Sequence, residues 1–167
     1  EKSDYFIDYN VNSFVGRREE LEYLVSVAFQ NQTVIHGESG IGKSALMCKL
    51  YSLLVQGAGA DTLILFHSAG VSSYAQSVFD VATSWMRQIY AWLGKPEIGD
   101  NRPLIDHFRV LMAYARERGK RVLVMIDALD RFLVDNDSRF LPFIPDELPV
   151  VISVLPDRVE SLKLQHP

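Results

Sequence analysis

The stretch that decides the fold of this chain is Gly37-Glu38-Ser39-Gly40-Ile41-Gly42-Lys43-Ser44. It matches the pattern G-x-x-x-x-G-K-[ST] at every fixed position. A short β-type run at 33–36 precedes it, and a helical pattern that carries Leu46, Leu50 and Leu54 follows it. The sequence therefore predicts a strand, a glycine-rich loop and a helix in succession, which is the context in which this pattern cradles phosphate.

Strand and helix patterns continue to alternate on both sides of this unit. Further β-type apolar runs occupy 62–66, 121–127 and 150–155, with helical patterns between them. Strands that alternate with helices predict an α/β fold, a three-layer sandwich around a mostly parallel sheet. A length of 167 residues and an apolar share of 48% fit one P-loop nucleotide-binding domain over 1–167.

Two helices carry more specific signals. Upstream of the loop, the amphipathic spacing falls on Leu21, Leu24, Val25 and Ala28. Downstream, Ser73 and Gln76 have the form of a capping box, which predicts the start of the helix that stops near Gly94.

The loop explains how a nucleotide could be held. Its glycines let the backbone wrap around a phosphate, whose charge meets exposed N–H groups and the positive end of the following helix. Lys43 supplies a charge for the β- and γ-phosphates, and the Ser44 hydroxyl is a ligand for Mg²⁺. We therefore expect ATP or ADP with Mg²⁺ as cofactors. The nucleotide-binding residues expected here are Gly37, Glu38, Ser39, Gly40, Ile41, Gly42, Lys43, Ser44 and Ala45.

An apolar run at 122–126 ends in Asp127, which has the form of a Walker B element and is the second candidate metal ligand beside Ser44. The next residue is Ala128, whereas many P-loop ATPases have a water-activating glutamate at that position. Asp130 is the nearest substitute, and its alternative role is that of a loop carboxylate that caps or is solvated. The candidate catalytic set is therefore Lys43, Asp127 and Asp130.

Composition narrows the class of partner. A net charge of -4 gives no broad positive field for sequence-independent binding to nucleic acid, so nucleic acid is an unexpected partner. The basic residues Arg116, Arg118, Lys120 and Arg121 are interpreted as a solvated helix end.

The single cysteine and the lack of a long apolar run favour an intracellular, cytoplasmic protein without a membrane span. The start at Glu1 suggests a fragment of a longer protein.

Four stretches of the chain, at 14–21, 66–70, 126–130 and 141–155, resemble the STAND class of signalling P-loop NTPases and, within it, NACHT-type domains. Residues 14–21 contain a Val-Gly-Arg element, and 126–130 resemble the family's Walker B with a second acidic residue downstream. The resemblance implies that Val15 and Arg17 lie near the adenine and ribose. It also implies that Ser153 is the sensor 1 group facing the γ-phosphate, for which Arg158 is the alternative, and that a helical lid and a winged-helix domain follow in the family.

The function expected from this resemblance is that of a signalling ATPase, in which bound Mg·ATP is slowly hydrolysed to reset a conformational switch. Expected partners are the nucleotide, other domains of the same polypeptide and, on activation, further copies of the chain. One alternative is a pseudo-ATPase scaffold that holds nucleotide structurally. Another is a DNA-loading ATPase of the origin-recognition type, which is expected to have an Asp-Glu pair where this sequence has Asp127-Ala128, and basic accessory elements that are not seen here. No guanine-reading Asn-Lys-x-Asp is present, which favours ATP over GTP.

Overall fold

The computed structural model describes residues 2–12, 16–30, 32–70, 77–96, 102–133, 144 and 147–159. The elements in chain order are α1 (Lys2–Asn12), α2 (Arg18–Val27), β1 (Gln32–His36), α3 (Lys43–Gly57), β2 (Thr62–Ser68), α4 (Val78–Trp92), α5 (Leu104–Glu117), β3 (Arg121–Asp127), α6 (Asp130–Leu133), β4 (Val150–Val154) and a 3₁₀ turn (Pro156–Arg158).

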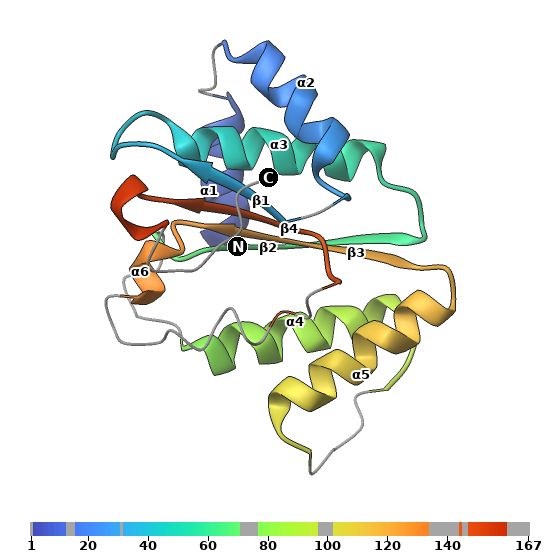
Figure 1. The fold of residues 1–167 in the computed structure, drawn as a ribbon. Coiled ribbons are helices and arrows are strands. Elements are labelled where there is room, and N and C mark those ends of the chain that lie inside the picture. Colours follow the sequence, from blue (N-terminus) through green and yellow to red (C-terminus); the bar gives the residue numbers. More distant parts are fainter. Residues whose placement is uncertain are drawn as a thin grey trace.

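The strands form one parallel sheet with the order β1-β4-β3-β2 (Figure 1). The last strand in the chain is thus inserted between the strand before the glycine-rich loop and the strand that ends in Asp127. The register pairs Ile126 with Ile152 and Ser68 with Asp127, so β2, β3 and β4 end at the same edge of the sheet. Ligands of open parallel sheets bind at this carboxyl edge.

Helices cover both faces of the sheet. Alternate strand residues such as Leu123, Met125 and Val151 pack with α2 and α3 on one face. Their neighbours, such as Val124 and Ile152, pack with α4 and α5 on the other face. Every residue of β4 is buried, as expected of a strand covered on both faces. The predicted three-layer α/β sandwich is confirmed (Figure 1).

Three local features differ from expectation or extend it. The helix α4 begins after Ser77, which forms a capping box with Asp80, while the predicted box at Ser73 and Gln76 lies outside the described residues. Val25 is 39% exposed rather than on the buried face of α2 with Leu21 and Leu24, because the apolar stripe of α2 is narrow. The helix α1 has no counterpart among the sequence predictions, and it packs beside α3. In the part of the chain that is described, no helix is long and apolar enough to cross a membrane.

Candidate nucleotide-binding site

The glycine-rich loop joins β1 to the N-terminus of α3. Gly40 and Gly42 have φ angles of 82° and 88°, a left-handed conformation that glycine adopts without the steric cost that a Cβ brings. Gly42 is also the N-cap of α3, and no side chain caps this helix end. The first N–H groups of a helix have no partner within the helix, so this end offers donors and a positive dipole to an anion.

The side chain of Lys43 is hydrogen-bonded to the backbone of the glycine-rich loop. Its Nζ donates hydrogen bonds to the carbonyl oxygens of Gly37 and Glu38, the latter at 2.8 Å. At Gly37, a Cβ would stand 2.1 Å from Cδ1 of Ile41, so a larger residue would have to displace the end of that side chain. An ammonium group has three donors, so a phosphate oxygen can be added to these two loop contacts.

Arg17 supports the loop from outside. It adopts a left-handed conformation with φ of 53° just before α2, and its guanidinium donates a hydrogen bond to the carbonyl of Ile41. Arg17 therefore links the start of α2 to the glycine-rich loop. Its expected position beside the nucleoside stays a prediction, and Val15, the other residue of that expectation, lies outside the described residues.

Asp127 ends β3 with its carboxylate held by hydroxyl groups from both neighbouring strands. Oγ of Ser68 in β2 donates to Oδ2 at 2.9 Å, and Oγ of Ser153 in β4 donates to Oδ1 at 2.6 Å. Asp127 is 1% exposed, and Ser68 and Ser153 are 8% and 1% exposed. Hydroxyl donors in fixed positions stabilise the charged carboxylate and fix its orientation, which is what a metal ligand at this position requires.

The chain then turns sharply at Ala128, whose φ is 56°. The Ala128 N–H donates to Oγ of Ser153 at 2.8 Å, and the Leu129 N–H donates to the Ser153 carbonyl at 3.0 Å. This turn places Asp130 at the start of α6. Ser153 thus fixes both Asp127 and the turn toward Asp130. Its expected contact with a γ-phosphate stays a prediction.

One cavity of about 580 Å³ brings most of these groups together. The residues expected from the sequence that line it are Ser39, Gly40, Gly42, Lys43, Ser44, Ala45, Asp127, Asp130 and Ser153. Arg17, Gly37, Glu38 and Ile41 do not line it and instead shape or support the loop. Ser44 and Asp127, a hydroxyl and a carboxylate on one cavity, are a donor pair suited to Mg²⁺. Among the described residues, no group of three or more His, Cys, Asp or Glu side chains could hold a metal.

Several residues on this cavity are absent from the sequence predictions. Phe6 and Asn10 come from α1, Ser68 and Gly70 from the end of β2, and Arg131 from α6. The signal for Ser68 was its position at the carboxyl end of a strand, where parallel sheets gather their functional groups. For α1, the sequence offered only a weak apolar pattern.

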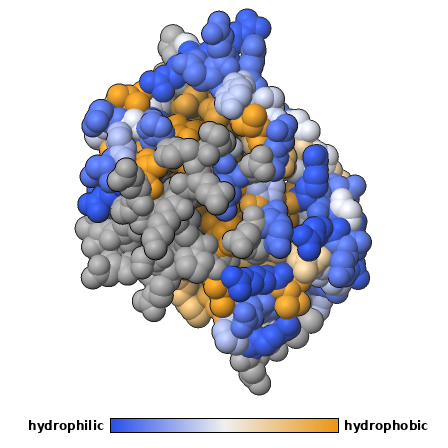
Figure 2. Space-filling model, in the orientation of Figure 1, coloured by the Kyte–Doolittle hydropathy of each residue, from blue (hydrophilic) through white to orange (hydrophobic). Residues whose placement is uncertain are grey.

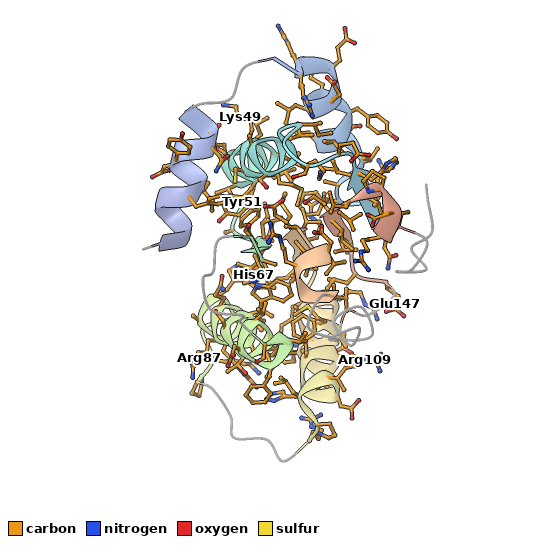
Figure 3. All side chains as sticks on the ribbon, turned by 90° about the vertical axis from the view of Figure 1, so that its left-hand side faces the viewer. Lys49, Tyr51, His67, Arg87, Arg109 and Glu147 are labelled. Atoms are coloured by element: carbon orange, nitrogen blue, oxygen red, sulfur yellow. The ribbon has the colours of Figure 1, made fainter. Side chains whose placement is uncertain are left out.

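The charge of Asp127 reaches two buried groups on opposite faces of the sheet. Burial raises the pKa of Cys48 on α3 to about 12, and the charge of Asp127 adds to this rise. Burial lowers the pKa of His67 to about 4, against the smaller opposite effect of Asp127. Figure 3 shows His67 on the α4 side of the sheet, while Tyr51 lies on the α3 side and contacts Phe66 with ring centroids 5.1 Å apart.

The fold is shared with two archaeal structures. A crystal structure of Cdc6p from Pyrobaculum aerophilum aligns with a TM-score of 0.58 and 17% identity, over 89% of this chain and 42% of the other. A structure of the ORC2 protein from Aeropyrum pernix in ADPNP–ADP complexes aligns with a TM-score of 0.60 and 18% identity, over 90% and 43%. The chain thus spans less than half the length of either protein. A search of curated protein sequences finds no match.

The sequence pattern of the NACHT domain matches residues 31–163, which is most of the chain. The match includes the glycine-rich loop, Asp127, Asp130 and Ser153. The expected resemblance is therefore confirmed, and the chain belongs to the NACHT family of P-loop NTPase domains.

Proposed function

We propose that this domain binds Mg·ATP in the cavity at the carboxyl edge of the sheet and hydrolyses it slowly. One observation carries the proposal. The N-terminus of α3, with Lys43 and Ser44, lies on the same 580 Å³ cavity as Asp127 and Asp130. The cavity is within the roughly 300–1,000 Å³ range of small-molecule sites.

Each group on the cavity has a role in this proposal. The amides at the start of α3 bind the β-phosphate, and Lys43 adds a positive charge for the β- and γ-phosphates. Ser44 and Asp127 would hold Mg²⁺, which supplies charge neutralisation of the phosphate oxygens when bound. Asp130 orients a water molecule in line with the γ-phosphate and accepts its proton. On the nucleoside side, we assign contacts to Val15 and Arg17.

Slow turnover follows from the turn after β3. The residue next to Asp127 is Ala128, so water positioning falls to Asp130, which is three residues away on a different backbone element. In a longer polypeptide, slow hydrolysis allows bound ATP to bias one conformation for a long time and allows ADP to mark the reset state. This is the switch of a STAND-type signalling ATPase, acting on other domains of its polypeptide and, on activation, on further copies of itself in the cytoplasm.

A second candidate function is a pseudo-ATPase scaffold that holds nucleotide without turning it over. The observation that favours it is Ala128 directly after Asp127, at the position where many P-loop ATPases have a water-activating glutamate. ATP turnover by the full-length polypeptide separates the two functions. DNA loading is not proposed, because the similarity to Cdc6p and ORC2 concerns the fold and the net charge of -4 offers few phosphate contacts.

The test of nucleotide binding is the replacement Lys43→Ala, measured by calorimetry with Mg·ATP. The loss of one charge-assisted contact to phosphate, typically ~1.5–3 kcal/mol, should weaken binding about tenfold or more. Lys49→Ala is the matched control, because Lys49 lies on the same helix but does not line the cavity (Figure 3). Equal affinities for the parent and the Lys43→Ala protein would remove the loop as a functional site.

A further inference from the structure

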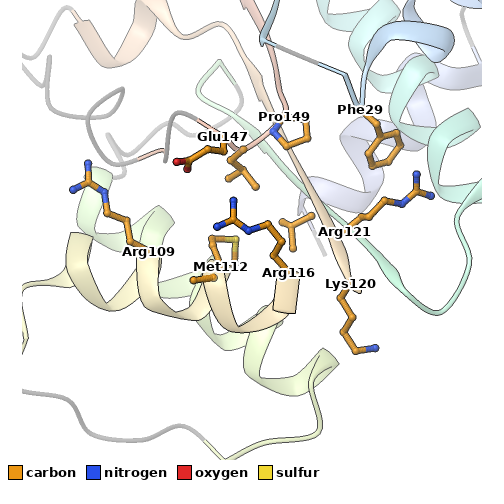
Figure 4. A pocket seen from close by; sticks show the side chains of 11 residues that line it. Phe29, Arg109, Met112, Arg116, Lys120, Arg121, Glu147 and Pro149 are labelled. Carbon is orange, nitrogen blue, oxygen red and sulfur yellow. The ribbon is translucent and has the colours of Figure 1, made fainter. Parts of the chain in front are cut away.

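A second cavity lies at the opposite edge of the sheet, where β3 and β4 begin and α5 ends. Its volume is about 510 Å³, and it shares no lining residue with the nucleotide cavity. Three of the four basic residues interpreted above as a solvated helix end line this cavity, namely Arg116, Lys120 and Arg121, and Arg109 joins them (Figure 4). The cluster therefore forms one wall of a cavity.

Two of these cations have partners at the rim. Nζ of Lys120 lies 3.1 Å from Oδ1 of Asp61, and the side chain of Lys120 points away from the cavity. The guanidinium of Arg121 lies 4.9 Å from the ring centroid of Phe29 and donates to Oγ1 of Thr62 at 3.3 Å. These contacts fix the rim in place.

Arg116 differs from its neighbours. Its guanidinium makes no hydrogen bond or ion pair with the residues that the structure describes. Figure 4 shows its guanidinium extending over the cavity between Met112 and Glu147, with Arg109 on the far side of Glu147. A guanidinium in this position presents its fork of N–H donors to whatever enters the cavity.

The remaining lining is largely apolar and comes from three elements. Met112 on α5, Val122 at the start of β3 and Leu148 before β4 are 8%, 6% and 9% exposed. Ala113 and Pro149 are half-buried beside them. The starts of β3 and β4 and the end of α5 lie at the right-hand side of Figure 1, and in the same view in Figure 2 this side is covered mainly by hydrophilic residues, with apolar surface between them. The cavity thus combines an apolar floor with a cationic rim.

The charge of the cavity lining indicates which class of ligand the cavity binds. The cavity lining carries four basic residues and one carboxylate, Glu147, in a chain whose net charge is -4, and Arg109 and Arg116 are the two basic side chains that lie beside Glu147 (Figure 4). A concave surface with one prevailing sign of charge concentrates the electric field and attracts ions of the opposite sign. We propose that this cavity binds a small organic anion with an apolar body, whose acidic group pairs with Arg116 and whose apolar part lies on Met112, Val122 and Leu148.

The probe for this site is 8-anilinonaphthalene-1-sulfonate, an aromatic anion whose fluorescence rises in apolar surroundings. Arg116→Gln should weaken its binding about tenfold, which is the typical effect of one charge-assisted contact. Arg118→Gln is the matched control, because Arg118 lies at the same helix end but donates to the Tyr114 carbonyl and does not line the cavity. The control should change affinity by less than about twofold, since an exposed charge outside the cavity is screened by water and salt.

Two further measurements locate the probe. Ala113→Leu adds apolar volume inside the cavity without changing charge, so it should weaken binding by competition for space. In the unaltered protein, methyl NMR should show a shift of the Met112 signal on titration and none of Met47, which is buried in the other core. N-phenyl-1-naphthylamine, the neutral analogue, should bind more weakly and be insensitive to Arg116→Gln.

Equal weakening by Arg116→Gln and Arg118→Gln would overturn the proposal, because it would show attraction to the helix end in general. Unchanged binding in Ala113→Leu together with an unshifted Met112 signal would also overturn it. Displacement of the probe by ATP would place the probe in the nucleotide cavity and refute a separate site.

Discussion

Ser68→Ala tests the hydroxyl clamp on Asp127, by which we mean the hydrogen bonds that Ser68 and Ser153 donate to its carboxylate. The substitution removes the donor that lies 2.9 Å from Oδ2 of a carboxylate that is 1% exposed. Water has little access to replace that donor, while Ser153 still holds the other oxygen. The expected loss is that of one hydrogen bond to a charged group, about 1.5–3 kcal/mol in the free energy of unfolding. For a domain of this size that loss lowers Tm by roughly 3–12 °C.

The assay is urea denaturation followed by tryptophan fluorescence, because Trp85 is 1% exposed in the core beneath the sheet. Ser84→Ala on the exposed face of α4 is the control and should change stability by less than about 0.5 kcal/mol. A double-mutant cycle with Asp127→Asn isolates the contact, and Ser68→Ala should cost at least ~1 kcal/mol less in the Asn background. Strictly additive effects would refute the reasoning, because they would show that Ser68 does not act through Asp127.

Three further predictions concern the same edge of the sheet. Asp127→Asn should impair Mg²⁺-dependent ATP affinity and turnover together. Asp130→Asn should leave ATP affinity near normal, while the rate of single-turnover hydrolysis falls ~10²–10⁴-fold. Hydrolysis by Asp130→Asn at the parent rate would show that Asp130 has no part in the reaction. The pKa of His67 is 6.5 in the unfolded chain and about 4 in the fold, so between these pH values only the unfolded chain binds the proton. The free energy of unfolding should therefore decrease as pH falls from 6.5 toward 4, by up to ~1.4 kcal/mol per pH unit. His67→Gln should remove that part of the slope in urea titrations, and an unchanged slope would contradict the assignment. Cys48 is 0% exposed with a pKa raised to about 12, so a thiol reagent at pH 8 should label it only after unfolding, and rapid labelling of the native protein would contradict its burial.

Local spacing was enough to predict the glycine-rich loop and the strand that ends in Asp127. Both depend on contacts within a few residues, since a glycine-rich turn and a helix N-terminus are formed by neighbours in the chain. The alternation of strands and helices likewise predicted the layers of the fold, because apolar faces of both kinds must be buried against each other.

The clamp on Asp127 could not be predicted in the same way. Ser68 and Ser153 are separated from Asp127 by 59 and 26 positions in the sequence. They meet it only because β3 lies between β2 and β4 in the strand order, which long-range packing decides. A one-residue change in the register of Ile126 with Ile152 would turn Ser153 to the other face of the sheet. The helix α1, with its weak apolar pattern, depends on α3 for its packing partner.

The left-handed backbone at Ala128 sets the direction of any side chain placed directly after Asp127. A glutamate introduced there would keep φ of 56°, and the cost of about 1–2 kcal/mol that this conformation brings for a residue with a Cβ is already present with alanine. The Ala128 methyl lies 3.8 Å from where a Cβ on Gly70 would stand, so a longer side chain would extend over the end of β2. A change in this turn would break the hydrogen bond that the Ala128 N–H donates to Oγ of Ser153, and the same Oγ donates to Oδ1 of Asp127. The geometry of this turn and the orientation of the Asp127 carboxylate are therefore coupled through a single hydroxyl, so a substitution that shifts one of them should shift the other.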